Sequence, residues 1–160
     1  VTGTKSTDLF EESFRFVLPG YNVRPIEMSG ALGKTQLSKL PELIQGRRKN
    51  GELFTTAMEK HPLFRIQKEV GTSSWFGFSL VLRSDSDLDR KKIVKRLNIL
   101  GFECRPIVGG NFANSEVMKY IDHSVHGELL NAEYIDKFGL FIGNHHYPIE
   151  DAIGTLVTLN

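Results

Sequence analysis

The segment Leu18–Leu37 constrains the fold more than any other part of the sequence, because it passes from a turn through an extended stretch into a helix. Pro19-Gly20 is a turn dipeptide, and the chain after it must run extended because the residue before Pro25 is kept out of the α region. Pro25 itself suits the first position of a helix. Gly30 and Gly33 fall inside that helix, where each costs about 1 kcal/mol relative to alanine, so we expect another surface to approach this backbone closely. The segment therefore predicts a rigid polar stub in front of a helix suited to close contact.

The composition is typical of an ordinary globular domain. The 160 residues are 40% hydrophobic and 24% charged, which suits a chain that buries a core. A formal net charge of +1 argues against a nucleic-acid-binding or membrane-surface protein. The single Cys104 excludes an intrachain disulfide, and no apolar run in the sequence has the length of a membrane span. We therefore expect a cytoplasmic protein.

Hydrophobic spacing predicts a helix from Pro25 to about Leu40, an interruption at Pro41, and a second helix to about Lys60. Strands are predicted at 64–67, 75–82, 102–108 and 139–143, and short helices at about 116–121, 131–137 and 149–159. A further helix, capped by the polar run 84–87, should end at Gly101. This inventory predicts an α/β or α+β fold, with helices packed on a mixed or antiparallel sheet.

Two local patterns predict structure rather than a binding site. Alternation along the second strand places Phe76 and Phe78 on the face opposite Trp75, and we expect both phenylalanines to pack in the core. The basic triplet Arg47-Arg48-Lys49 lies on the outer face of a helix, where such runs are usually solvated. No phosphate site is therefore predicted at the triplet.

The histidines do not predict a metal site. His123 and His126 lie in a stretch with little helical character. His145 and His146 are adjacent, so on an extended chain they point in opposite directions. His145 follows the end of a predicted strand, which is a common position for active-site residues.

Four polar residues are candidates for binding an anion. Asn22 can offer an amide donor without the cost of burying a charge, or it can bond to its own turn. Arg24 suits a phosphate or carboxylate, or a surface ion pair. After Arg105, the pair Gly109-Gly110 could form an anion-binding nest in front of Asn111, although two glycines after a strand most often form only a turn. The residues alone leave these alternatives open.

Taken together, these segments resemble the DegT/DnrJ/EryC1/StrS family of sugar aminotransferases. The likeness runs through nearly the whole chain. The motifs that carry it include Gly3-Thr4-Lys5-Ser6, Gly20-Tyr21-Asn22-Val23-Arg24-Pro25, Ser73-Ser74-Trp75-Phe76-Gly77, Arg105-Pro106-Ile107-Val108-Gly109-Gly110-Asn111 and Ile142-Gly143-Asn144-His145-His146. The resemblance implies the C-terminal small domain of a fold-type-I transferase that depends on pyridoxal 5'-phosphate or pyridoxamine 5'-phosphate. Residues 1–24 would be an arm from a preceding large domain, residues 25–60 a long interrupted connecting helix, and residues 61–160 the small α/β domain.

The resemblance also implies roles for individual residues. Asn22 would reach across a homodimer interface to the cofactor phosphate of the other subunit. The substrate side would be lined by Tyr21, Arg24, Arg105, Asn111 and His145. The family's catalytic residues, including the Schiff-base lysine or the histidine that replaces it, would precede this sequence. The 160 residues would then contain no catalytic residue and be inactive alone.

Within the family the likeness is strongest to the branch of lipopolysaccharide O-antigen biosynthesis that removes the C3 hydroxyl of GDP-4-keto-6-deoxymannose, with glutamate restoring the cofactor amine. A nucleotide-sugar 4-aminotransferase of the perosamine synthase type is the alternative enzyme. A non-catalytic dimerisation or binding module is the alternative from another class of protein. Neither nucleic acid nor a membrane is an expected partner.

Overall fold

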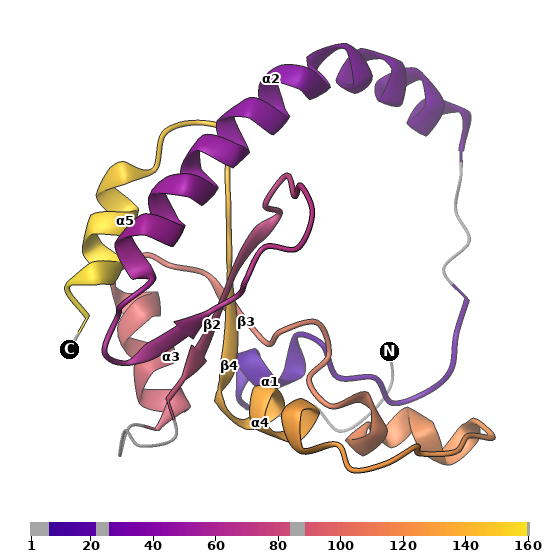
Figure 1. The fold of residues 1–160 in the computed structure, drawn as a ribbon. Helices are drawn as coiled ribbons and strands as arrows, with labels where there is room; N and C mark the ends of the chain where they lie inside the picture. The colour runs from indigo at the N-terminus through magenta and orange to yellow at the C-terminus, as the bar shows by residue number, and fades with distance from the viewer. Residues whose placement is uncertain (1–6, 22–25, 84–88, 160) are drawn as a thin grey trace.

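The computed structural model describes residues 7–21, 26–83 and 89–159. In chain order its elements are α1 (Leu9–Glu12), α2 (Glu27–Met58), β1 (Phe64–Ile66), β2 (Gly77–Leu82), α3 (Arg90–Ile99), β3 (Cys104–Arg105), the 3₁₀ helices η1 (Phe112–Asn114) and η2 (Glu116–Tyr120), α4 (Leu130–Phe138), β4 (Gly139–Gly143) and α5 (Glu150–Val157). Figure 1 shows the sheet below a long arching α2, with α5 and α3 on one side of it. Among the described residues, no helix is both long and apolar enough to cross a lipid bilayer.

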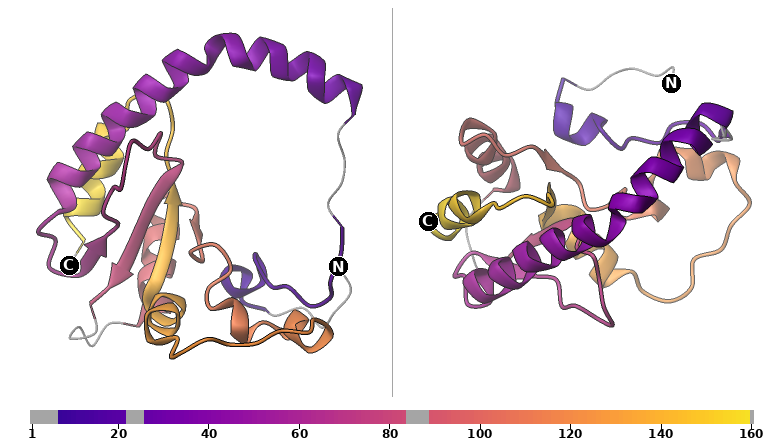
Figure 2. Two further views of the ribbon diagram at one scale, coloured as in Figure 1. Left: turned by 45° about the vertical axis from the view of Figure 1, so that its right-hand side comes forward. Right: turned by 90° about the horizontal axis from the view of Figure 1, so that it is seen from above.

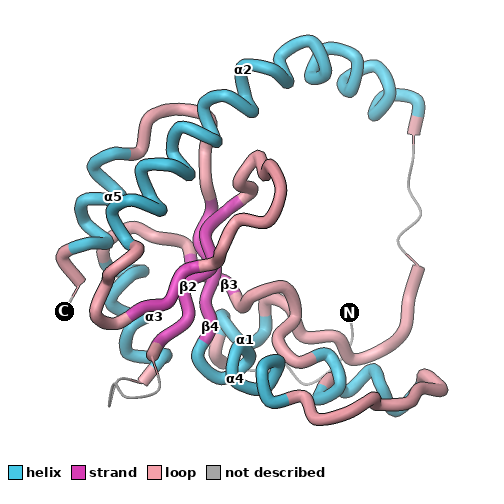
Figure 3. Tube along the Cα trace, in the orientation of Figure 1, coloured by secondary structure: helices cyan, strands magenta, loops and turns pink. Residues whose placement is uncertain are grey.

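The strands form one four-stranded sheet in the order β1-β2-β4-β3, and every neighbouring pair is antiparallel. The longest ladder joins β2 to β4, with Phe78 opposite Ile142 and Ser79 opposite Phe141. Helices lie between β2 and β3 and between β3 and β4 along the chain, as the secondary-structure view shows (Figure 3). The prediction of an α/β or α+β fold with helices on an antiparallel sheet is confirmed.

One face of the sheet carries the hydrophobic core. Phe78, Leu80 and Leu82 alternate along β2, so all three side chains point to the same face, where they are buried. The helices α2, α3 and α5 supply the other side of the core through Phe54, Met58, Ile93, Val94, Leu97, Ile153 and Leu156. Burial of each large side chain contributes about 1.5–3 kcal/mol, which makes this layer the main source of stability.

Helix α2 runs through Pro41 without a break, so the predicted interruption there is wrong. Proline removes one backbone donor and crowds the preceding turn, which bends a helix more readily than it ends one when the flanking residues are good helix formers. The ribbon accordingly arches near its middle, and its first half projects away from the sheet in both views of Figure 2. The division of the chain at residues 24 and 60 remains a proposal.

Other predicted boundaries shift for local reasons. The third strand is limited to Cys104–Arg105, because Pro106 has no N–H to donate and Val108 takes a positive φ of 57°. Helix α3 is capped by Asp89, whose carboxylate accepts from Lys91 N at 2.9 Å. The predicted capping run 84–87 lies outside the described part of the chain. Gly101 ends this helix with φ 89°, as predicted.

The segment around α1 packs against the rest of the chain. Glu11 pairs with Arg90 of α3 at 2.8 Å, and Arg15 pairs with Glu116 of η2 at 2.8 Å. The Phe16 carbonyl accepts from Val117 N and Ser115 Oγ. Residues 8–17 therefore lie against α3 and the 3₁₀ helices.

Candidate functional site

A cavity of about 630 Å³ opens where β2 begins and β4 ends. Its lining comes from α2, the start of β2, the α3–β3 connection, β3, the end of β4 and α5: Arg47, Phe76, Phe78, Leu100, Gly101, Phe102, Glu103, Arg105, Phe141, Ile142, Gly143, Asn144, His145, Tyr147, Ile149, Ala152, Ile153 and Leu156. A volume of this order suits a small organic ligand. The lining combines an apolar floor with a few polar and aromatic groups at the rim.

Two guanidinium groups reach the cavity from different elements. Arg105 lies on edge strand β3 and pairs with Glu103 through contacts of 2.6 and 2.9 Å. Arg47 lies on α2, and its guanidinium carbon is 5.7 Å from the centre of the Phe76 ring. Arginine is always charged and donates in a planar fork that matches phosphate, so the two residues together suit an anionic ligand.

The basic triplet Arg47-Arg48-Lys49 was predicted to be a solvated face, and the position of Arg47 shows that this is wrong for its first residue. The neighbouring Arg48 donates its Nε–H to the Ser73 carbonyl at 3.0 Å, and Lys49 lies 3.9 Å from Glu150. The triplet is therefore not a uniform solvated face, because its first member lines the cavity. Helical spacing cannot show this, since the cavity forms only when the ends of β2 and β4 are brought next to α2.

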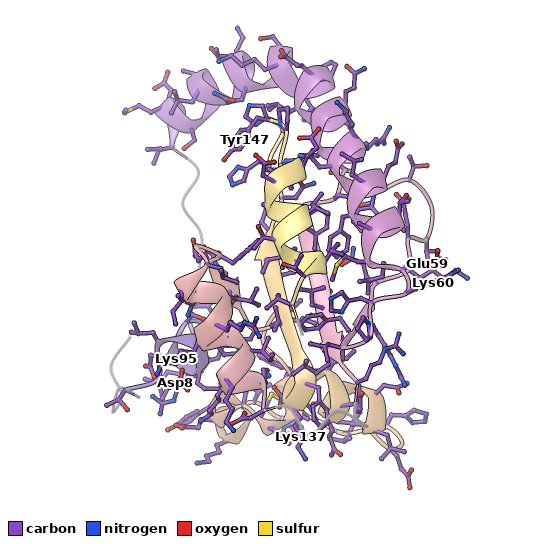
Figure 4. All side chains as sticks on the ribbon, turned by 90° about the vertical axis from the view of Figure 1, so that its left-hand side faces the viewer. Asp8, Glu59, Lys60, Lys95, Lys137 and Tyr147 are labelled. Atoms are coloured by element: carbon purple, nitrogen blue, oxygen red, sulfur yellow. The ribbon has the colours of Figure 1, made fainter. Side chains whose placement is uncertain are left out.

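Two stacked aromatic pairs line the cavity. Phe76 and Phe141 stack with centroids 5.9 Å apart, and His145 and Tyr147 stack at 4.5 Å. Figure 4 labels Tyr147 beneath α2 and close to the start of α5. Phe76 is 72% exposed, so the prediction that it packs in the core is wrong. Trp75 has a positive φ of 52°, which breaks the alternation and turns its own ring inward and Phe76 outward.

The structure brings only part of the predicted site together. Arg105 and His145 both line the cavity. Asn111 does not line it: the residue is buried, its Oδ1 accepts from Ala113 N at 3.2 Å, and its Nδ2 has no hydrogen-bond partner among the described residues. Tyr21 is 95% exposed, and Asn22 and Arg24 lie outside the described residues.

Burial sets the chemistry of Cys104, which lies on β3 next to Arg105. Burial, with a smaller contribution from the Glu103 carboxylate, raises the pKa of its thiol to about 12. The thiol stays protonated at neutral pH and is a poor nucleophile. Cys104 is therefore not a candidate nucleophile.

The cavity lining does not fit the reactive end of pyridoxal phosphate. No lysine occurs among the described residues of the lining, so this wall offers no amine to the cofactor aldehyde. Its arginines and aromatic rings fit an anionic, ring-containing ligand better. Within the described residues there is also no group of three or more His, Cys, Asp or Glu side chains that could hold a metal ion.

Comparison with known proteins decides the family. A model of the DegT/DnrJ/EryC1/StrS aminotransferase family matches residues 2–151. The chain belongs to this family. Among its members, GDP-4-keto-6-deoxy-D-mannose 3-dehydratase from Escherichia coli O55:H7 is 57% identical over 98% of this chain, and the Yersinia pseudotuberculosis protein of the same name is 54% identical over 99%.

Solved structures of similar proteins agree with the fold. The Escherichia coli dehydratase with bound hydrated PLP has a TM-score of 0.79 over 98% of this chain. An aminotransferase from Helicobacter pylori, 19% identical, has a TM-score of 0.65 and shares the fold. The chain spans about two-fifths of the length of the two dehydratases, 40% of one and 41% of the other.

Proposed function

We propose that these 160 residues form part of a pyridoxal-phosphate-dependent dehydratase that removes the C3 hydroxyl of GDP-4-keto-6-deoxymannose. The observation that carries this proposal is the 57% identity to the Escherichia coli dehydratase over 98% of the chain. Two further solved structures of that dehydratase support it, one with a PLP-glutamate geminal diamine and one with GDP-perosamine. The proposal includes a homodimer, glutamate as amine donor, and a cytoplasmic location.

The cavity supports a role for this chain in binding the nucleotide sugar. Arg105 and Arg47 can neutralise the diphosphate, and the exposed rings of Phe76 and Tyr147 offer surfaces for stacking. His145 lines the same cavity and is proposed to contact the substrate. Tyr21, Arg24 and Asn111 are proposed to contact the substrate, and Asn22 to contact the cofactor phosphate of the partner subunit.

When bound, the cofactor supplies an electron sink next to the sugar, so that a proton and the C3 hydroxyl can leave. We propose that the cavity residues of this chain bind, orient and shield the substrate. Positioning of this kind lowers the barrier by removing translational and rotational freedom before the reaction. We expect the 160-residue chain alone to be inactive, because it spans only about two-fifths of the length of the dehydratases that it resembles.

The test is product analysis with the full-length protein, pyridoxal phosphate, glutamate and GDP-4-keto-6-deoxymannose. We expect a 3-deoxy sugar nucleotide, identified by mass and NMR. A 4-amino sugar would instead show an aminotransferase of the perosamine synthase type. If neither product forms with active cofactor bound, the proposed substrate is wrong.

Two matched pairs of variants locate the binding site. Arg105→Ala should raise the KM for the nucleotide sugar by about tenfold or more, since a charge-assisted bond contributes roughly 1.5–3 kcal/mol. Arg65→Ala is the control, because Arg65 lies on the opposite edge strand β1 and outside the cavity lining. His145→Ala should likewise raise this KM more than its control His146→Ala, because only His145 lines the cavity. Equal effects within both pairs would contradict the assignment of this cavity.

A further inference from the structure

A pair of buried asparagines ties together the segments that form the rim of the cavity. Asn50 lies in the second half of α2 and is 1% exposed, and Asn144 follows β4 and is 4% exposed. The Asn50 amide donates to the carbonyls of His145 at 2.9 Å and Tyr147 at 2.8 Å, and lies 3.3 Å from Asn144 Oδ1. These two side chains therefore link α2 to the segment that carries His145 and Tyr147.

Asn144 extends the link to the start of β2. Its Nδ2 donates to the Trp75 carbonyl at 2.8 Å and to the Arg47 carbonyl at 3.0 Å. Its backbone N–H donates to the Phe76 carbonyl at 3.3 Å. The asparagine pair thus bonds to the backbone of cavity residues Arg47, Phe76, His145 and Tyr147, and leaves their side chains available to the cavity.

The clamp, as we call the pair Asn50 and Asn144, also holds a strained residue in place. Trp75 has a φ of 52°, a region that a bulky residue enters at a cost of order 1–3 kcal/mol. Its N–H donates to Ser73 Oγ at 2.9 Å, its carbonyl accepts from Asn144, and its ring lies so close to Gly51 that a Cβ there would come within 2.6 Å of it. This conformation is what turns Phe76 outward, so the direction of the Phe76 ring depends on the clamp.

We infer that Asn144, supported by Asn50, is a positioning residue for the nucleotide sugar. Asn144 bonds to the backbone of Trp75 and Phe76, and Asn50 bonds to the backbone of His145 and Tyr147, so the pair connects the two segments on either side of the cavity. The inference rests on the proposed function, in which this cavity takes the nucleotide sugar. Arg105 lies on β3 and its guanidinium bonds to Glu103, so it provides a separate reporter of the same site.

Truncation of Asn144 removes the amide that donates to the buried Trp75 carbonyl, and the loss of such a partner costs about 1–3 kcal/mol. We expect part of that cost to appear as greater mobility of the segments that carry Phe76, His145 and Tyr147. For Asn144→Ala in the full-length holoenzyme we expect the Kd of GDP and the KM for the nucleotide sugar to rise about tenfold, equivalent to about 1.4 kcal/mol. Cofactor affinity and the KM for glutamate should stay within about twofold, which a general loss of structure would not allow.

The control for general destabilisation is Val94→Ala. Val94 is buried in the core on α3 and lies outside the cavity lining. This variant should lower the Tm while leaving the affinity for GDP unchanged. If Asn144→Ala weakens the nucleotide-sugar and glutamate reactions equally, or leaves GDP affinity unchanged, the positioning role is overturned.

A milder variant covers the case in which Asn144→Ala does not fold. Ser73→Ala removes only the hydroxyl that accepts from Trp75 N, and should raise the Kd of GDP by roughly threefold, as expected for a partial loss of one hydrogen bond. No change in that Kd would overturn the inference. If Arg105→Ala also has no effect on GDP binding, the cavity is not the nucleotide site, and the proposed role of this chain fails as well. If Arg105→Ala weakens GDP binding but Asn144→Ala does not, only the positioning role of Asn144 is rejected.

Discussion

The two halves of α2 belong to one continuous helix but differ completely in their surroundings. Every side chain from residue 27 to residue 42 is exposed, whereas Asn50, Gly51, Phe54 and Met58 in the second half are buried. Both halves carry apolar residues: Met28, Leu32 and Leu37 are each more than 60% exposed, and Phe54 is fully buried. Hydrophobic spacing therefore identifies a helix but does not show which half of it is covered by the rest of the chain.

The sharpest test of this contrast is a pair of truncations in the 160-residue chain. Phe54 stacks on Phe78 with ring centroids 4.0 Å apart, so Phe54→Ala should lower the free energy of unfolding by about 3–5 kcal/mol. Leu37→Ala in the first half should change it by no more than about 0.5 kcal/mol. Urea unfolding at low protein concentration measures both. A large effect of Leu37→Ala would show that the first half is covered after all.

The exposed apolar stripe of the first half should cause the chain to self-associate. We expect oligomers in light scattering across a concentration series, through this helix or through the N-terminal arm. Leu32→Glu should weaken the association about tenfold, which corresponds to about 1.4 kcal/mol. Ile99→Glu is the control, because Ile99 is 77% exposed on α3, far from α2 in sequence. A strictly monomeric chain at high concentration would contradict the prediction.

The end of the buried half should respond to pH through His61. Its ring is 4% exposed, its Nδ1 accepts from Leu63 N at 3.2 Å, and burial lowers the pKa of the ring below 6.5. Because the folded state favours the neutral ring, His61 supports stability above pH 6.5, and that contribution is lost as the pH falls through the lowered pKa. Tm measured from pH 8 to pH 5 should fall less steeply in His61→Phe. Parallel profiles for the two proteins would rule out His61 as the cause.

The smallest expected effect is on the reactivity of the Cys104 thiol, which lies on edge strand β3 beside the cavity. With its pKa raised to about 12, Cys104 should react with a thiol reagent at pH 8 at well under about 1% of the rate for a free cysteine. In urea the same thiol should react at the full rate, which serves as the internal control. Fast reaction in the folded protein would show that β3 opens readily from β4, in contrast to the closely packed second half of α2.

Much of the local structure could be predicted because it depends on neighbouring residues. Gly139–Gly143 forms the predicted strand, and Gly101 ends α3 where only glycine tolerates the backbone. The family could also be recognised, since its motifs are short stretches of sequence. The placement of His145 just after a strand followed from the same local reasoning.

The rest depended on contacts between segments distant in the sequence. Arg47 was assigned to a solvated face and Phe76 to the core, and both line the cavity. Neither error could be avoided by periodicity, because Arg47 meets the end of β4 through Asn144, some 97 residues away, and Phe76 is turned outward by the conformation of Trp75. The sequence by itself determined the family and most of the helices, whose hydrogen bonds and caps lie close along the chain, and it indicated the strands through their alternating pattern. Only the tertiary structure decided which half of α2 is buried and which side chains share a cavity, because burial is set by the surfaces that meet when distant segments pack together.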